Sequence, residues 1–340
     1  MVTAKTEDLR ITLEKIILLI KEKSLADENV GKVSYRNGRF WCKTEDTKAS
    51  IKAPFLEGMP DFCIEGLDLL RYLQKVDKKE IDLEKENNLL FIRGKRSKAS
   101  FSCFESFSFS LPKKWDKIGP GFLEGVKEAR NYISKSFYRP VLTTVCVKEN
   151  SIQASNGLVY FRTLGEDDFL KKEETLIPGS GISFLVTLNP SEYCIDDTMI
   201  YFRKDSDFVG ACALMGGVYP DVVEMKKDYE KGKFVSFHSQ TKNVIERCSV
   251  FVERMRFEEE KEVYVTLKRK KAYIKVKSNI GSNEEIFKAK YDESLEGLSF
   301  CLRPDFFLKI LEKSTKFLIC TNSIQLKNKT LWLVAALTKA

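Results

Sequence analysis

The chain has 340 residues, of which 43% are hydrophobic and 31% are charged. This length suits two or three domains of ordinary size, and this composition indicates a folded globular protein and excludes a disordered one. The longest apolar run near the start, Ile16 to Ile20, is too short to span a bilayer, and the nearby Glu7, Asp8 and Glu14 argue against a secretory signal. The sequence therefore predicts a cytoplasmic protein with no membrane association.

Basic residues exceed acidic ones, with 57 Lys and Arg against 49 Asp and Glu and a formal net charge of +8. Residues 1–112 hold 20 basic against 18 acidic side chains, residues 113–232 hold 16 against 18, and residues 233–340 hold 21 against 13. Nearly all of the excess therefore lies in the last third. Such a balance is compatible with binding a polyanion, and equally with a solvated surface.

The nine cysteines form no Cys-x-x-Cys pair, and the single histidine, His238, has no cysteine near it in sequence. Zinc sites take their ligands from closely spaced Cys and His, so the sequence predicts no metal site and no cofactor. Several cysteines lie in apolar stretches, as Cys146 and Cys212 do. We expect small buried residues in a reducing compartment.

Three segments, residues 7–23, 121–135 and 240–250, predict amphipathic helices. Apolar residues recur in them at the 3.6-residue period, with charged residues between. The stripes are Leu9, Leu13, Ile16, Ile17 and Ile20 in the first, Phe122, Val126, Ala129 and Ile133 in the second, and Val244, Ile245 and Cys248 in the third. Their spacing indicates an internal repeat.

Each of these helices is followed by alternating runs that predict a β-hairpin. The turns are expected at Asn37-Gly38, at Glu149-Asn150 and within Lys268–Lys271. Of these, Asn-Gly is the strongest hairpin signal.

A second helix is predicted at Gly66–Lys75 in the first third and at Arg303–Lys313 in the last, each before further strands. In the middle third, Leu188–Tyr193 starts a helical pattern, but Asp196-Asp197 follows at once. Gly179–Gly181 is interpreted as a loop. The second helix of the middle third is therefore expected to be short or missing.

Polar segments with Pro or Gly, at Leu111–Lys114 and at Asp228–Gly232, predict the domain boundaries. The sequence thus predicts an α+β protein of three repeated domains, residues 1–112, 113–232 and 233–340. Each domain is expected to hold two helices on antiparallel sheets.

Four segments carry a resemblance to a known family: Arg139–Thr143, Ala154–Leu158, Gly216–Asp221 and Val244–Ser249. In the same order, they resemble four segments of bacterial replicative sliding clamps, the beta subunit of DNA polymerase III. These are the segment after the opening helix of the middle domain, an Ala-Thr-Asp-Gly sequence, a Gly-x-Phe-Pro-Asp sequence and the opening helix of the third domain. The resemblance extends over the whole chain, with the same threefold architecture.

The resemblance implies a homodimeric ring that encloses duplex DNA, with helices around the hole and sheets outside. Such clamps tether a DNA polymerase and other replication or repair proteins, are loaded by a clamp loader, and have no catalytic activity. A sliding protein needs mobile attraction to phosphates and not base readout. The candidate DNA-facing cations are Lys15, Arg71, Lys75, Lys127, Arg130, Lys242, Arg247 and Lys309.

The resemblance also implies a pocket between the middle and last domains, which receives a short apolar peptide from the polymerase or loader. Carried over by position, it comprises Leu142, Ser155, Gly157, Leu158, Val159, Tyr160, Pro220, Met225, Leu333, Ala335, Ala336 and Leu337. Two segments depart from the family. Leu158–Tyr160 stands where His-Arg-Leu is common, and Ala335–Lys339 where Met-Pro-Met-Arg-Leu is usual. These departures imply a divergent member with a reshaped pocket.

Three alternatives stand beside this interpretation. An enzyme is disfavoured because the chain has a single histidine and no nucleophile elbow, phosphate-binding loop or zinc-protease motif. A sequence-specific nucleic-acid binder would use Lys268–Lys271, but this run is expected at a solvent-facing hairpin tip. The third alternative is a sequence-independent DNA-binding or scaffold protein of clamp fold that does not close into a ring.

Overall fold

The computed structural model describes residues 1–17, 31–44, 46–94, 96–172, 174–252 and 261–339. Its contacts divide the chain into two compact units, Met1–Leu123 with Ile177–Met215, and Glu124–Leu176 with Gly216–Ala340. The three predicted domains remain a prediction, since the division into units crosses the middle one. No helix of the described ranges is long and apolar enough to cross a membrane.

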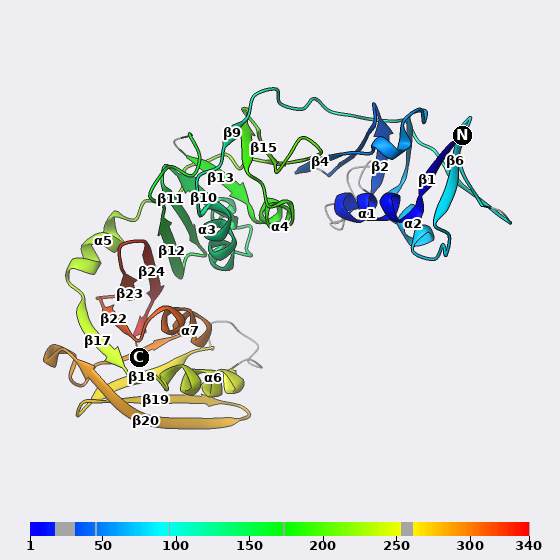
Figure 1. The fold of residues 1–340 in the computed structure, drawn as a ribbon. Coiled ribbons are helices and arrows are strands. Elements are labelled where there is room, and N and C mark those ends of the chain that lie inside the picture. The colour runs from blue at the N-terminus through cyan, green and yellow to red at the C-terminus, as the bar shows by residue number, and fades with distance from the viewer. Residues whose placement is uncertain (18–30, 45, 95, 173, 253–260, 340) are drawn as a thin grey trace. The chain divides into compact units, whose positions relative to one another are not determined.

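The first unit opens with two helices that pack on two antiparallel sheets (Figure 1). The helices are α1 (Thr6–Ile17) and α2 (Gly66–Leu73). One sheet has the order β1-β6-β7-β8, with β1 (Val2–Lys5), β6 (Glu80–Glu86), β7 (Leu89–Gly94) and β8 (Ser97–Ser102). The other begins β5-β2-β3-β4, with β5 (Phe62–Glu65), β2 (Lys32–Arg36), β3 (Arg39–Lys43) and β4 (Thr47–Lys52).

Helix α1 confirms the first predicted stripe as far as it is described. Leu9, Leu13, Ile16 and Ile17 are buried in one core with residues of both sheets, because the helical period brings them onto one face. The predicted residues 18–23, with Ile20, lie outside the described residues. The β2–β3 turn is also confirmed: Asn37 and Gly38 have positive φ of 53° and 71°, as a tight hairpin turn requires.

The rest of the first unit extends the second sheet. Its full order is β5-β2-β3-β4-β16-β15-β14-β9, with β16 (Phe208–Ala213), β15 (Met199–Arg203), β14 (Glu192–Ile195) and β9 (Asp116–Lys117). Helix α4 (Gly179–Leu188) packs on β16 and β15.

Helix α4 corrects the prediction for the middle third. Its second helix is present with ten residues, and it begins at Gly179, in the segment interpreted as a loop. Leu188 is the last residue of this helix, and Glu192 already begins strand β14. The pattern misled because the helix is rich in Gly, Ser and apolar residues and carries no charge, so it lacks the polar face that marks a surface helix.

The second unit is built on one sheet with the order β13-β10-β11-β12-β24-β23-β22-β17-β20-β19-β18-β21-β25. Its first strands are β10 (Thr144–Lys148), β11 (Ser151–Ser155), β12 (Val159–Leu164) and β13 (Thr175–Pro178). They are preceded by α3 (Phe122–Ala129) and two 3-10 turns, Arg130–Tyr132 and Pro140–Thr143. Helix α3 is shorter than predicted, and the buried residue after it is Tyr132 and not Ile133.

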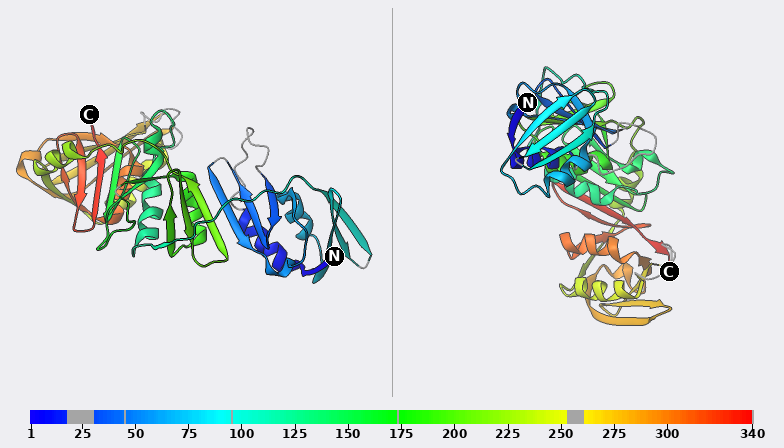
Figure 2. Two further views of the ribbon diagram at one scale, coloured as in Figure 1. Left: turned by 90° about the horizontal axis from the view of Figure 1, so that it is seen from above. Right: turned by 90° about the vertical axis from the view of Figure 1, so that its right-hand side faces the viewer.

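The last third repeats the pattern of the first. The helices α6 (Thr241–Val252) and α7 (Pro304–Lys313) pack on each other, with α6 against β19 and β20 and α7 against β24 (Figures 1 and 2). The strands are β17 (Lys233–Phe237), β18 (Val263–Lys268), β19 (Lys271–Ser278), β20 (Gly281–Tyr291), β21 (Ser299–Leu302), β22 (Lys316–Ile319), β23 (Ser323–Lys327), β24 (Leu331–Ala336) and β25 (Thr338–Lys339). Edge-to-face rings of Phe237, Phe287, Phe307 and Phe317 fill the core. The stripe Val244, Ile245 and Cys248 is buried as predicted.

A helix that was not predicted, α5 (Val223–Glu230), precedes β17. The predicted linker Asp228–Gly232 therefore begins inside a helix. The Asp228 carboxylate accepts hydrogen bonds from Thr321 N (3.0 Å) and Ser323 Oγ (2.9 Å), and these hold its pKa below the usual range. The segment is thus tied to the last β-hairpins of the unit and is not a free connection.

Seven of the nine cysteines are buried, and all nine are free thiols; Cys103 and Cys194 are half-buried. Burial raises the pKa of the Cys146 and Cys212 thiols to about 12. Such thiols are inert packing residues, as expected from their apolar surroundings.

Candidate functional site

The first strand junction joins β4 to β16 within the first compact unit. The strands pair antiparallel, with Phe208↔Ile51, Val209↔Ser50, Gly210↔Ala49, Ala211↔Lys48 and Cys212↔Thr47. Two further backbone hydrogen bonds close the ladder: Lys52 N donates to Asp207 O (2.8 Å), and Ala213 N donates to Asp46 O (2.7 Å).

The second junction joins β12 to β24 within the second compact unit. The pairs are Val159↔Ala335, Tyr160↔Val334, Phe161↔Leu333, Arg162↔Trp332 and Thr163↔Leu331. The same two closing bonds are present, from Leu164 N to Thr330 O (2.8 Å) and from Ala336 N to Leu158 O (2.8 Å). The hairpin registers make Lys52 equivalent to Leu164, because they pair with the first residues of β3 and β11 respectively. Equivalent residues therefore pair with each other in the two junctions, so the junctions have the same register.

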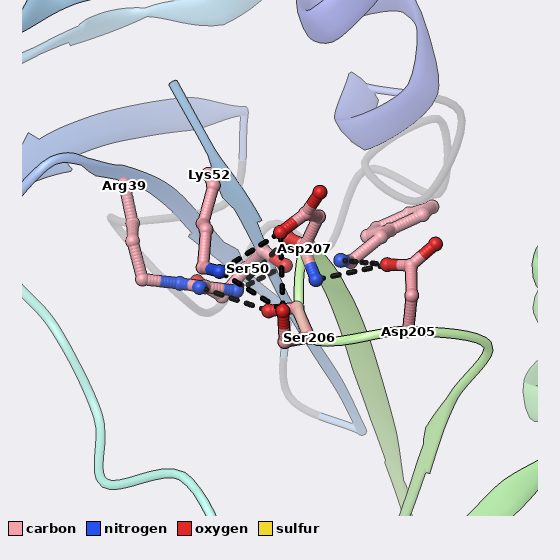
Figure 3. A network of polar contacts seen from close by, with 7 residues as sticks. Arg39, Ser50, Lys52, Asp205, Ser206 and Asp207 are labelled. Atoms are coloured by element: carbon pink, nitrogen blue, oxygen red, sulfur yellow. Dashed lines mark hydrogen bonds and ion pairs between the residues drawn. The ribbon is translucent and has the colours of Figure 1, made fainter. Parts of the chain in front are cut away.

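Charged side chains stabilise the first junction (Figure 3). Lys52 Nζ lies 2.9 Å from Asp207 Oδ1, and this interaction lowers the pKa of the Asp207 carboxyl. The Arg39 guanidinium donates to Ser206 O (3.2 Å) and Asp207 O (3.0 Å), while burial lowers its pKa. Asp205 Oδ1 accepts from Asp207 N (2.8 Å) and orders the same turn. Two cations from β3 and β4 thus hold the loop that leads into β16.

A groove of about 410 Å³ lies beside the second junction. Tyr160 lines the groove and packs edge to face against Trp332, with ring centroids 5.5 Å apart, and the two rings cluster with Val222, Val334 and Met225. Side chains of α5 and of the loop Thr321–Ser323 form its margin. The lining is apolar at the floor and charged at the rim, as suits a short amphipathic peptide.

Polar groups fix the aromatic floor. Tyr160 Oη donates to Gln153 Oε1 (2.9 Å), and Trp332 Nε1 donates to Gln325 Oε1 (3.0 Å). Gln325 Nε2 in turn donates to Met225 O (3.2 Å), which ties α5 to the sheet. Burial raises the pKa of the Tyr160 hydroxyl, so it remains a neutral donor.

The predicted pocket residues fall into two groups. Those that line the groove are Ser155, Gly157, Leu158, Val159, Tyr160, Met225 and Ala336. Leu142, Pro220 and Leu337 are not in the lining, although a Cβ at Gly157 would lie 3.9 Å from Leu142 Cδ1. Leu333 and Ala335 are fully buried, because alternate residues of a strand face opposite sides and Val334 and Ala336 take the groove side.

The resemblance did not include Val334 or the acidic and basic residues of α5 that also line the groove, among them Glu224 and Asp228. Alternation along Leu331–Ala336 is the sequence signal that favours Val334 over Leu333 and Ala335. The residues of α5 had no such signal, since the helix itself was not predicted.

The predicted DNA-facing cations divide by their partners. Lys15, Lys75, Lys127 and Arg130 are exposed, and no acidic residue of the described chain pairs with them. Arg71 lies 3.7 Å from Asp68 at a well-exposed position, a weak pair in water.

The other three cations are engaged with groups of the protein. Arg247 forms two hydrogen bonds to the Glu285 carboxylate, at 2.8 and 2.6 Å, and lowers its pKa. Lys242 lies 3.4 Å from Glu312. Lys309 Nζ donates to Asn131 O (2.6 Å) and stands over the Tyr132 ring, and burial lowers its pKa. These three side chains connect elements of the fold.

No family model matches the sequence, and no curated protein matches it. Solved structures are similar in fold over the whole chain. A DNA polymerase sliding clamp from Bacillus subtilis is 16% identical and has a TM-score of 0.82, with 99% of this chain and 98% of that chain covered. The DNA polymerase III subunit beta from Pseudomonas aeruginosa is 13% identical with a TM-score of 0.81, covering 100% of both chains.

A sliding clamp from Bartonella birtlesii bound to griselimycin is 15% identical with a TM-score of 0.82, covering 100% of this chain and 99% of that chain. At these identities the likeness is one of fold. The predicted α+β fold class and the resemblance to the clamp architecture are thereby confirmed.

Proposed function

We propose that this protein is a DNA sliding clamp, a processivity factor that encircles duplex DNA and has no catalytic activity or cofactor of its own. The observation that supports this proposal is the similarity in fold, over the whole chain, to sliding clamps that are at most 16% identical in sequence. Its partners would be a DNA polymerase and a clamp loader. Nine free thiols suit the reducing cytoplasm, where such a clamp acts.

Two free strand edges support closure of a homodimeric ring. Among the residues that the structure describes, strand β8 ends its sheet, and residues 281–288 of β20 pair on one side only, with β19. In the repeat these edges are the equivalents of the strands that meet at the other two junctions. β8 corresponds to β16 and β24, and β20 to β4 and β12. An exposed edge of unpaired N–H and C=O groups is a template for another strand.

The shared register of the two junctions predicts the register of a third, formed between protomers. Asn283 would stand opposite the partner's Phe101, Glu284 opposite the partner's Ser100 and Glu285 opposite the partner's Ala99. Ile286 would meet the partner's Lys98. Two such contacts, related by a twofold axis, close a dimer.

Cysteine pairs test this register. Directly opposite strand residues have Cα atoms about 4.5–5.5 Å apart, within the range of a disulfide. The double variant Ser100→Cys/Glu284→Cys is expected to form a covalent dimer on oxidation. The control Ser100→Cys/Ser282→Cys, two residues out of register, is expected to remain monomeric in a denaturing gel. Equal cross-linking of both pairs would refute the register.

The same variant tests encirclement. The reduced protein is mixed with nicked circular DNA and then oxidised, so that each ring closes covalently on the circle. We expect the linked dimer to stay with circular DNA in high salt and detergent, and to be released when the DNA is cut once. Loss of protein from circular and linear DNA alike would favour a clamp-fold scaffold that does not enclose DNA.

We propose that the groove beside the second junction takes the partner peptide. Burial of one Leu or Phe anchor over Tyr160, Val334 and Met225 would yield roughly 1.5–3 kcal/mol. Lys231 at the rim suits an acidic residue beside that anchor, whereas Lys227 is paired with Glu224 at 2.7 Å. This assignment keeps seven of the twelve predicted residues in the lining and adds Val334.

A further inference from the structure

The third repeat carries a second surface, on the sheet face opposite its helices. Ala272, Ile274 and Val276 of β19 are buried on the side of α6, so the residues between them point the other way. Tyr264 of β18 is 47% exposed there, and Ile286 of β20 is 53% exposed. Tyr273 of β19 pairs with Ile286 on one side and with Thr266 on the other, and it is the diagonal neighbour of Tyr264, which pairs with Lys275. We call this surface the tyrosine face.

A row of cations borders the tyrosine face. Lys268, Lys271 and Lys288 are neighbours across three strands, since Lys268 pairs with Lys271 and Lys271 with Lys288. All three are exposed, and within the described chain no carboxylate lies at ion-pair distance from any of them. Three parallel cations at strand spacing would repel one another unless an anion lay across them.

Hydrogen bonds hold the turn that completes this row. Arg269 and Lys270 have positive φ of 53° and 57°. Arg269 N donates to Glu296 Oε1 (2.9 Å), and Lys270 N donates to Tyr291 Oη (2.9 Å). Tyr291 Oη donates in turn to Glu296 Oε2 (2.7 Å). Glu296 therefore fixes the turn through its backbone, and the two cationic side chains project from a preorganised position.

The face is hollowed between its aromatic and basic parts. A depression of about 400 Å³ lies at Tyr264 and Tyr273, with Lys268, Arg269 and Lys275 at its margin. Lys275 forms an ion pair with Glu284 at 3.6 Å, and the Glu296 carboxylate lies near Lys268 and Arg269 without an ion pair to either among described residues. Flat aromatic rings on adjacent strands beside a line of cations are the arrangement that meets bases and phosphates together.

We propose that the tyrosine face binds single-stranded nucleic acid. Unpaired bases stack on Tyr264 and Tyr273, and the backbone runs along Lys268, Arg269, Lys271 and Lys288. A duplex is disfavoured because its base faces are covered. The inference goes beyond the proposed function: it needs no ring, and it gives the charge excess of the last third a role outside any enclosed duplex.

Fluorescence anisotropy of a labelled oligothymidylate with the full chain tests the proposal. The variant Tyr264→Ala/Tyr273→Ala is expected to bind about tenfold or more weakly, since each stacked base contributes about 1–3 kcal/mol. Tyr264→Phe/Tyr273→Phe keeps the rings and is expected to bind like the wild type. The variant Lys268→Ala/Arg269→Ala/Lys271→Ala is expected to flatten the salt dependence by about 2 in the log–log slope, at roughly 0.7 for each phosphate.

The matched control Lys148→Ala/Lys316→Ala/Lys329→Ala removes the same charge from exposed positions on other strands and turns, and is expected to keep the wild-type slope. Thermal unfolding of every variant shows that the fold persists. If Tyr264→Ala/Tyr273→Ala bound oligothymidylate as tightly as the wild type, base stacking on these rings would be refuted. Equal affinity of the face for polyglutamate would also overturn the proposal, in favour of an acidic protein segment. Either failure leaves the ring experiment unaffected.

Discussion

Two glycines let α4 approach β16 closely. A Cβ at Gly181 would lie 2.6 Å from Cys212 Sγ, and a Cβ at Gly210 would lie 1.4 Å from Phe184 Cζ. Neither glycine has a positive φ. Glycine is therefore required at these positions because a side chain would not fit, and not because of the backbone conformation. The helix of the middle third thus depends on two positions where no side chain fits.

Replacing Gly210 with alanine is therefore expected to destabilise the first unit. The Phe184 ring would have to leave its place, and overpacking of this kind costs about 1–3 kcal/mol in the free energy of unfolding. Urea unfolding followed by circular dichroism measures the change. Gly216→Ala is the control, because no atom of the described residues lies within 4 Å of its Cβ position, and it is expected to stay within about 0.5 kcal/mol of the wild type. Equal effects of the two changes would contradict this account.

The Asp207 carboxyl gives the first junction a dependence on pH. Its pKa is lowered, chiefly by the hydrogen bond from Lys52, so the folded state favours the charged form. The stability it contributes is present above the ordinary pKa of an aspartate and is lost as the pH falls through the lowered value. Because Asp207 is largely exposed, we expect a small effect.

The variant Asp207→Asn tests this sign. The difference in urea midpoint between wild type and variant is expected to be largest near pH 7 and to vanish in acid below the lowered pKa. Asp46→Asn, a change of an exposed aspartate outside the Lys52 network, is the control for loss of one charge. A difference that stayed constant across the acid range would exclude the ion pair as its source.

At the scale of elements, the sequence predicted the helices that have one apolar and one polar face. The stripes of α1, α6 and α7 are buried as their periods require. Helix α4 was missed because it is apolar on most sides, and α5 because it is polar on most sides and buries none of its residues. A period carries no information when all faces of a helix have the same character.

The groove shows the same limit for strands. Leu333 and Ala335 were assigned to the predicted site by their position in the resemblance alone. Because side chains alternate along a strand, both residues point into the core. Leu333→Asp is therefore expected to unfold the second unit, because it buries an unpaired charge. Ala336→Asp is expected to leave the fold intact and to weaken binding of an apolar clamp-binding peptide about tenfold or more. Thermal unfolding and peptide anisotropy separate the two outcomes, and the reverse pattern would place the groove on the other face.

At the scale of the whole molecule, the two strand junctions repeat the same pairing register but not the same residue types. Thr47 and Val159 occupy one equivalent position, as do Cys212 and Ala335, yet the pairs share no chemistry beyond modest size. From helices and hairpins the sequence predicts three repeated domains, and this division remains a prediction. The sequence could not predict that their junctions share a register, because strand pairing between distant segments leaves no pattern in either one.

Charge in the whole molecule leads to the last prediction, which separates cations free to meet DNA from those that hold the fold. Neutralising Lys15, Lys75, Lys127 and Arg130 together is expected to weaken duplex binding and to flatten its log–log salt dependence by roughly 0.9 for each phosphate that the protein no longer neutralises. Neutralising Lys242, Arg247 and Lys309 is expected to lower the unfolding temperature more than the salt slope, since these side chains bind Glu312, Glu285 and Asn131 O. A control at exposed positions elsewhere, Lys148, Lys204, Lys316 and Lys329, removes four charges and is expected to keep the slope. An unchanged slope in the first variant would remove those four residues from the DNA-binding surface. The salt dependence of duplex binding would then come from other cations.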